Sequence, residues 1–271
     1  MVRIVQIAPV GFEYDRIIEG VNCHPCNIIY LLRSYKPAIK GADPDKLMIE
    51  IAENFVDKLE KHFQSTKICQ PIVKNALIID LEEIIKELCE IIQEEINKNH
   101  VDEIWINIST STKLFVSAAM YVGSFKPEIV KLFYLDASHY TDNDLFKPNL
   151  KKEDIKKKFE EKGITYRLDS TSYKSVEVPS YPFEEIENTK KNILKSLKAM
   201  CDKRQIKEVR FMELLKDLNK DPYDKTVKMR FGHHIKKLKA RNLIIEKTQG
   251  RQKKYSLTNQ GRLLGLILSY F

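Results

Sequence analysis

The stretch DEIWINISTSTKLFVSAAMYVG, from Asp102 to Gly123, constrains the fold of this chain more than any other. The apolar run from Ile104 to Ile108 predicts a strand, and the hydroxyl residues from Ser109 to Thr112 predict a short loop. Lys113 then begins an almost wholly apolar segment of helical length. Backbone N–H groups at a helix start have no partner within the helix, and the helix dipole favours an anion there. The pattern therefore predicts a phosphate-holding loop, although a loop that performs chemistry or only caps the helix would have the same signature.

Predicted strands and helices alternate along the first two thirds of the chain. The predicted strands are Val2–Ala8, Ile28–Leu32, Lys67–Gln70, Ile104–Ile108, Lys131–Leu135, Ile164–Leu168 and Tyr173–Val178. The predicted helices are Phe12–Val21, Asp45–Phe63 and Leu81–Ile96, with a charged helix or loop at Lys151–Lys162. This order predicts an α/β fold with a Rossmann-like parallel sheet covered on both faces. Ligands bind beyond the carboxyl ends of the strands in such sheets, so the polar loops Pro9–Arg16 and Ser109–Lys113 are expected to face one crevice.

Charge divides the chain into two parts. From Ile186 to Phe271 the sequence has 22 Lys and Arg residues against 8 Asp and Glu, a net charge of +14, whereas the rest has 24 against 30, a net charge of −6. The stiff segment Pro179-Ser180-Tyr181-Pro182 lies just before this change. We therefore expect two domains, residues 1–182 and 183–271, and the second is suited to meet a polyanion.

The basic part of the chain is expected to form helices first and then a hairpin. The predicted elements are helices at Asn188–Met200, Ile206–Leu218 and Asp224–Arg241, strands at Leu243–Ile245 and Tyr255–Leu257, and a final helix after Gly261. The segment LKARNLIIEKTQGRQKKYSLTNQGRLLG, from Leu238 to Gly265, closely resembles the recognition helix and wing of archaeal and bacterial winged-helix regulators. This order is that of a winged helix-turn-helix, and a charged helix pair used for a protein contact is the alternative.

The resemblance implies that double-stranded DNA is a partner of this domain. A helix fits the major groove, where cationic side chains reach base edges and phosphates, and the wing lies on the backbone or in the minor groove. The expected DNA-contacting residues of the helix are Lys225, Lys228, Arg230, His233, Lys236 and Lys237. Those of the wing are Arg251, Gln252, Lys253 and Lys254.

Five cysteines, an odd number, are typical of a protein from a reducing compartment. The motif Cys23-His24-Pro25-Cys26 lacks a second pair that would complete a zinc site, and it precedes a strand rather than a helix start that would stabilise a thiolate. A structural loop is the favoured interpretation, and a metal or redox role stays open. The chain has no run of about 18 apolar residues and no signal-peptide pattern, so we expect a cytoplasmic protein without a membrane span.

Several common catalytic and nucleotide-binding motifs are missing from the sequence. It contains no GxxxxGK, GxGxxG, HExxH or GxSxG segment. The scattered histidines His24, His62, His100 and His139 are expected to be structural. Apart from the open question of the Cys23 and Cys26 pair, we therefore expect no metal site and no cofactor.

Two segments together suggest a family. The loop APVGFEYDR, from Ala8 to Arg16, and the segment WINISTSTKLFVSAAM, from Trp105 to Met120, resemble those of CRISPR-associated Rossmann-fold (CARF) regulators, as does the attached winged helix. The resemblance covers essentially the whole chain, and its most specific element is the loop of small residues before Lys113. Family members more often carry a glycine in that loop, where this chain has Ser111 and Thr112. Glycine permits the closest approach of a backbone to a ligand.

The resemblance implies a ligand, a partner and a set of site residues. It implies a homodimer in which two such loops face each other across a twofold axis, with a cyclic oligoadenylate bound there, most often the tetra-adenylate ring. The implied ligand-binding residues are Val10, Gly11, Phe12, Glu13, Arg16, Asn107, Ser109, Thr110, Ser111, Thr112 and Lys113. Glu13 is expected to accept a hydrogen bond from an adenine amino group or to pair with Arg16.

Three functions are compatible with this sequence. The first is a DNA-binding transcriptional regulator that responds to cyclic oligoadenylate and has no catalytic activity. The second is a metal-independent ring nuclease, in which a ribose 2′-OH attacks its own phosphate while Lys113 or Ser109 steadies the charge. The sequence shows no dedicated general base for that reaction. The third is a winged-helix regulator that senses another nucleotide or none.

Overall fold

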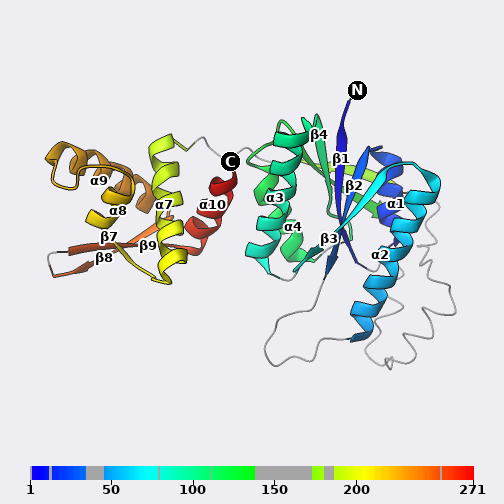
Figure 1. The fold of residues 1–271 in the computed structure, drawn as a ribbon, viewed down its shortest axis with the longest axis horizontal. Helices are drawn as coiled ribbons and strands as arrows, with labels where there is room; N and C mark the ends of the chain where they lie inside the picture. The colour runs from blue at the N-terminus through cyan, green and yellow to red at the C-terminus, as the bar shows by residue number, and fades with distance from the viewer. Residues whose placement is uncertain are drawn as a thin grey trace. The chain divides into compact units, whose positions relative to one another are not determined.

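The computed structural model describes residues 2–11, 14–34, 46–78, 80–110, 112–137, 173–179, 186–250 and 252–271. The predicted site residues Phe12, Glu13, Ser111 and Arg251 lie outside this part of the chain, as do the predicted helix or loop at 151–162 and the predicted strand at 164–168. Contacts between Cα atoms divide the chain into two compact units, Met1–Pro182 and Phe183–Phe271 (Figure 1).

The first unit is built on a six-stranded sheet. Its strands are β1 (Ile4–Val10), β2 (Ile28–Ser34), β3 (Gln70–Ala76), β4 (Glu103–Asn107), β5 (Val130–Ala137) and β6 (Tyr173–Val178). They lie in the order β3-β2-β1-β4-β5-β6. The pairs from β3 to β5 are parallel, and β6 is antiparallel to β5. The predicted α/β fold with a mostly parallel sheet is confirmed, with β6 as the exception to the predicted direction.

Helices cover both faces of this sheet. They are α1 (Tyr14–Cys23), α2 (Lys46–Thr66), α3 (Leu81–Asn99) and α4 (Lys113–Gly123). Figure 1 shows α1 and α2 on one face and α3 and α4 on the other. The core on the α1 and α2 face includes Phe55, Leu59 and Phe63, which are fully buried against the apolar residues of β1 and β2. Burial of each such side chain contributes about 1.5–3 kcal/mol to folding.

Gly20 lets α1 approach the sheet closely. A Cβ atom at this position would stand 2.7 Å from Nδ2 of Asn107 on β4. The backbone carbonyl of Gly20 accepts a hydrogen bond of 3.1 Å from Nε2 of Gln6 on β1. Because polar side chains of the sheet fill the space where a side chain would lie, α1 is held at a fixed depth above β1 and β4.

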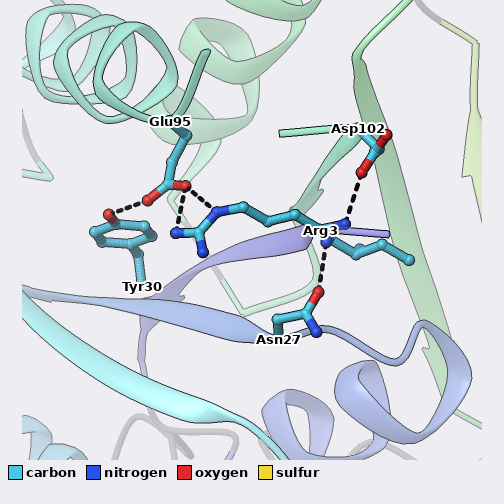
Figure 2. A network of polar contacts seen from close by, with 6 residues as sticks. Arg3, Asn27, Tyr30, Glu95 and Asp102 are labelled. Atoms are coloured by element: carbon cyan, nitrogen blue, oxygen red, sulfur yellow. Dashed lines mark hydrogen bonds and ion pairs between the residues drawn. The ribbon is translucent and has the colours of Figure 1, made fainter. Parts of the chain in front are cut away.

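A buried carboxylate ties α3 to the amino ends of the first two strands (Figure 2). Glu95 is 1% exposed and accepts hydrogen bonds from the Tyr30 hydroxyl at 2.6 Å and from Nε of Arg3 at 3.0 Å. The backbone N–H of Arg3 donates to Asp102 at 2.6 Å. Burial, followed by the hydrogen bond to Glu95, raises the pKa of the Tyr30 hydroxyl. This network lies at the amino ends of the strands, so it stabilises the sheet away from the edge where ligands are expected.

The position of β3 differs from the prediction. The sequence pattern predicts a strand at Lys67–Gln70, but α2 continues to Thr66 and Lys67 has a φ of 55°. A left-handed residue at this point ends the helix, and the strand starts only at Gln70. Pro71 lies within β3, which is tolerated because β3 is at the edge of the sheet.

The second unit consists of helices and a small antiparallel sheet. The elements are α7 (Asn188–Arg204), β7 (Val209–Arg210), α8 (Phe211–Asp217), α9 (Lys225–Ala240), β8 (Ile244–Gln249), β9 (Gln252–Leu257) and α10 (Asn259–Tyr270). The sheet has the order β7-β9-β8. The helix predicted at Ile206–Leu218 is therefore wrong in its first part, because Val209 and Arg210 pair with Tyr255 and Lys254 of β9.

The start of α10 is fixed by its cap and by a glycine. Thr258 caps the helix by accepting a hydrogen bond of 3.0 Å from the N–H of Gly261. A Cβ atom at Gly261 would stand 2.0 Å from the carbonyl oxygen of Leu243. Only glycine allows this approach, which packs α10 against the start of the hairpin formed by β8 and β9.

Candidate functional site

The strand order places a candidate ligand site between β1 and β4. The chain moves from β1 toward β3 in one direction and returns to β4 on the other side of β1, so the loops after β1 and β4 lead to helices on opposite faces. In parallel α/β sheets this switch point is where ligands bind. A Cβ atom at Gly11 would stand 2.5 Å from the carbonyl oxygen of Thr110. The two predicted loops are therefore in direct contact, and glycine is required at position 11.

Hydrogen bonds inside the site fix the loop that follows β4. Oδ1 of Asn107 accepts a bond of 2.9 Å from the N–H of Ser109, and its Nδ2 donates to the carbonyl of Arg16 at 3.2 Å. The Thr110 hydroxyl donates to the carbonyl of Pro9 at 2.6 Å. The predicted residues Asn107 and Thr110 thus join the β4 loop to β1 and α1 and hold the backbone of the loop in place.

Arg16 lies beneath this loop. Its side chain is 2% exposed, and its Nη1 donates to the carbonyl oxygen of Ser109 at 2.9 Å. Its guanidinium carbon lies 5.6 Å from the ring centroid of Tyr134. The structure therefore places Arg16 where it supports the loop backbone. The expected pairing of Arg16 with Glu13 falls outside the described residues.

Thr112 and Lys113 form the start of α4. The hydroxyl of Thr112 accepts a bond of 3.2 Å from the N–H of Phe115 and donates to the carbonyl of Ile78 at 3.0 Å. Lys113 is the first residue of α4 and is exposed, and the first turn of the helix has no acidic residue. A cation at a helix start is unfavourable unless an anion lies nearby. An anion bound at this point would meet both the helix start and the ammonium group of Lys113.

The end of β5 is a part of the site that the sequence analysis missed. Oγ of Ser109 accepts a hydrogen bond of 2.8 Å from the N–H of Leu135, and Tyr134 lies under Arg16. The signal that could have found these residues is the strand order, because β5 lies next to β4 and its carboxyl end reaches the same edge. Val10, at the end of β1, is 1% exposed, so its side chain belongs to the core.

The cationic residues of α9 lie mostly on an exposed surface. Phe231, Ile235 and Leu238 are buried and hold α9 to its unit. The exposed predicted residues are Lys225, Arg230, His233, Lys236 and Lys237. Lys228 is half-buried, with its Nζ 5.9 Å from the ring centroid of Tyr223. These side chains offer positive charge to a partner along one side of the helix.

The wing, formed by β8, β9 and the turn between them, carries cations that are already paired. Nζ of Lys253 lies 3.3 Å from Glu246, which also meets Lys239 of α9 at 3.3 Å. Nζ of Lys254 lies 3.9 Å from Glu208. Burial acts to raise the pKa of the Glu246 carboxyl, but hydrogen bonds from Lys239 and Lys253 outweigh it and hold the pKa below its usual value. Gln252, also predicted to contact DNA, is exposed at the start of β9.

The two cysteines of the CxxC motif differ in solvent exposure. Cys23 is exposed at the end of α1, whereas Cys26 is buried. A hydrogen bond with the Cys69 thiol, together with burial, raises the pKa of the Cys26 thiol. Within the described part of the chain, no three or more His, Cys, Asp and Glu side chains are grouped so that they could hold a metal ion. None of the described helices is long and apolar enough to cross a membrane.

Comparison with solved structures found distant likenesses. Csm6 from Enterococcus italicus, bound to cyclic hexa-2'-fluoro-hexa-dAMP, is 13% identical with a TM-score of 0.39, over 90% of this chain and 56% of that one. Can2 from Sulfobacillus thermosulfidooxidans, in complex with cyclic tetra-adenylate, is 11% identical with a TM-score of 0.34, over 97% of this chain and 61% of that one. Drosophila ORC bound to DNA is 11% identical with a TM-score of 0.24, over 98% and 81% of the two chains. The chain thus spans less than two thirds of the length of the first two proteins.

Comparison with protein sequences and family models assigns the chain to a family. No match was found among curated proteins. A family model described as HFX_2341_N:-like, N-terminal, matches residues 4–140, from the start of β1 to just beyond β5. Because the match covers more than half of the sequence, the chain belongs to the HFX_2341_N-like family.

Proposed function

We propose that this protein is a DNA-binding transcriptional regulator linked to CRISPR defence. It responds to cyclic oligoadenylate, and the tetra-adenylate ring is the expected ligand. The observation that carries the proposal is the contact between the loops after β1 and β4, with the exposed cation Lys113 at the start of α4. The choice of cyclic oligoadenylate as the ligand rests on the resemblance of these two loops to those of CARF regulators. The net charge of +14 from Ile186 to Phe271 supports DNA as the partner of the second unit.

A homodimer fits the chemistry of a cyclic ligand. Two copies related by a twofold axis would bring two Lys113 ammonium groups and two starts of α4 to one ring of phosphates. Leu114 and Met120 lie on α4 and are each 42% exposed, and Ser117 between them is exposed as well. Burial of this apolar stripe in a second copy would help to hold the two loops together.

Calorimetry with the intact protein tests the ligand. The probes are cyclic tetra-adenylate, cyclic hexa-adenylate and linear tetra-adenylate. We expect binding of a cyclic form with one ring per two chains and a loss of at least tenfold in affinity for Lys113→Ala, because a charge-assisted contact to phosphate is lost. Lys86→Ala removes an exposed lysine of α3 and is the matched control. Absence of heat with every ring would overturn the proposal.

Fluorescence anisotropy with upstream DNA tests the output. Ligand bound at the twofold axis would change the spacing of two DNA-binding units, and therefore their fit to successive half-sites. We expect the dissociation constant for DNA to change when the ring is added, in either direction. If the ring binds but the DNA affinity is the same with and without it, the protein does not regulate DNA binding through the ring, and this part of the proposal is wrong.

The alternative is a metal-independent ring nuclease. The observation that bears on it is at Ser109, whose Oγ accepts from the N–H of Leu135, so that its hydroxyl proton is left for another acceptor. Ser109 is 8% exposed, and Lys113, four residues later in the sequence, is exposed. The structure would then hold the ring so that a ribose 2′-OH lies in line with its own phosphate. Incubation of the protein with the ring, beside Lys113→Ala, should yield linear products if this is right. A ring that stays intact after long incubation would exclude it.

A further inference from the structure

One large apolar side chain stands out on the cationic side of α9. Met229 is 76% exposed, although the opposite side of the same helix buries Phe231, Ile235 and Leu238. Lys225, His233 and Lys236 lie at helical spacing from Met229, at i−4, i+4 and i+7, and all three are exposed, as is the adjacent Arg230. A methionine held in water between cations gains nothing for folding, so its surroundings suggest a partner that is both anionic and locally apolar.

The surface of α9 around Met229 is open and carries cations but no acidic side chain of the helix. A Cβ atom at Gly232, one turn further along α9, would meet nothing within 4 Å, so no side chain stands above the helix backbone there. The sequence of α9, KTVKMRFGHHIKKLKA, contains no acidic residue. The charges of Arg230 and Lys236 are not neutralised by ion pairs within the described part of the chain. The helix can therefore approach a polyanion closely at this point.

The major groove of DNA combines these two properties. Phosphates line both of its edges, and its floor is polar except for the C5-methyl groups of thymines. In helix-turn-helix proteins, residues of the first part of the recognition helix contact the base edges. Met229 lies in the first part of α9, which begins at Lys225, and its flexible thioether adapts to an irregular apolar surface.

We propose that Met229 contacts the methyl group of a thymine in each half-site and thereby determines specificity at that base pair. This inference rests on the proposed DNA-binding function and extends it to one residue and one atom of the DNA. The cations around Met229 hold the helix in the groove, and they bind phosphates of any sequence. Met229 distinguishes thymine from the other bases, because thymine alone carries a methyl group in the major groove.

Replacement of thymine by uracil tests this contact, since it removes the methyl group and keeps the base pairing. The half-site is first selected from a random duplex library with the intact protein. Each thymine is then replaced by uracil in turn, and dissociation constants are measured by anisotropy. We expect about fourfold weaker binding at one thymine of each half-site, the factor expected for the loss of one buried methyl group. For Met229→Ala, the thymine and uracil duplexes should bind equally at that position.

Controls separate this inference from the proposed function. Ile68→Ala removes another exposed apolar side chain, in the first unit between α2 and β3 (48% exposed), and should keep the difference between thymine and uracil. A methyl effect that persists in Met229→Ala overturns the inference and leaves DNA binding intact. No selection of any DNA sequence by the wild-type protein overturns the proposed function itself. Loss of self-association in Met229→Ala, with DNA binding unchanged, would show that this side of α9 contacts protein and would also overturn the inference.

Discussion

The loop after β4 and the exposed side of α9 both carry polar side chains, but these side chains are committed in different ways. Asn107, Thr110 and Thr112 bond to backbone groups of β1, of α1 and of the segment before α3. On α9, Arg230 and Lys236 are exposed and bind nothing within the described part of the chain. A loop ordered in advance loses little entropy on binding, whereas an array of mobile cations gains affinity mainly from charge. Substitutions in the first region should therefore alter stability, and those in the second only affinity.

The largest effect is expected from Arg16→Ala. The variant leaves the buried carbonyl of Ser109 without its donor and opens space beside Tyr134, so the free energy of unfolding should fall by about 3 kcal/mol. Chemical denaturation measures this change. The control Arg33→Ala breaks an exposed bond to Asn75 and should cost less than about 1 kcal/mol. Superimposable denaturation curves for Arg16→Ala and wild type would show that the loop does not depend on this support.

A smaller loss, in DNA affinity alone, is expected when the α9 cations are neutralised. Replacement of Lys225, Arg230 and Lys236 by Gln should weaken DNA binding by roughly 2 kcal/mol, or about thirtyfold. The slope of log K against log salt should fall by roughly 2.7, about 0.9 for each lost phosphate contact. Salt titrations by anisotropy measure both quantities. Because these side chains are exposed, they are expected to contribute to DNA affinity alone, and an equal loss of folding stability would contradict this.

Thr112→Ala should have an intermediate effect on stability. It removes the cap of α4 and the bond to Ile78, and the free energy of unfolding should fall by about 1 kcal/mol. Thr112→Ser retains the hydroxyl group and serves as the control. Thermal unfolding followed by circular dichroism measures the difference. Equal midpoints for the Ala and Ser variants would mean that the cap contributes nothing.

The wing should contribute less than α9. Lys253 and Lys254 already lie beside Glu246 and Glu208, so neutralising them together with Arg251 should weaken DNA binding by less than about 1 kcal/mol. The loss should be similar for all DNA sequences, since such contacts reach the backbone. Binding to specific and random duplexes, measured side by side, tests this. A larger loss than that of the α9 variant would reverse the ranking.

The smallest effect is expected from pH. The pKa of Glu246 is lowered in the folded protein, so its contribution to stability is present above its ordinary pKa of 4.5 and is lost as the pH falls through the lower folded value. The pair is partly exposed and screened by solvent, so the contribution is on the order of a few tenths of a kcal/mol. Glu246→Gln should flatten the acid side of the stability profile. A profile unchanged by this substitution would remove the ion pairs of Glu246 from the account.

The sequence predicted the central strands and the edge strand β6 well, but it misplaced β3 and missed β7. The apolar runs of β1 and β2 are buried on both faces and those of β4 and β5 are mostly buried, which leaves a clear pattern, whereas the edge strand β3 contains Pro71 and is only half-buried. β7 has two residues, too few for any period, and is defined only by its pairing with β9. The left-handed conformation of Lys67 delays the start of β3, and β7 depends on a pairing with a distant strand that a local pattern does not contain.

The position of the loops after β1 and β4 at one edge of the sheet could be predicted from the sequence. The hydrogen-bond partners of their side chains could not. The alternation of strands and helices was enough to predict that both loops lie at one edge of the sheet. The partners of Ser109, Thr110 and Thr112 are groups of Leu135, Pro9 and Ile78, which are far away in the sequence. The sequence does not distinguish a hydroxyl group that is hydrogen-bonded to the backbone from one that is free to bind a ligand.

The hydrogen bond from Leu135 to Ser109 gives the candidate ligand loop a direct link to the route by which the chain leaves the first unit. Leu135 pairs with Ser175 of β6, and β6 ends at Val178, shortly before the second unit begins at Phe183. A displacement of the loop that breaks this bond would deprive β5 of a partner next to its pairing with β6. A change in the loop on ligand binding would therefore reach β6 through one hydrogen bond, between Leu135 and Ser109, and one strand pairing, between β5 and β6.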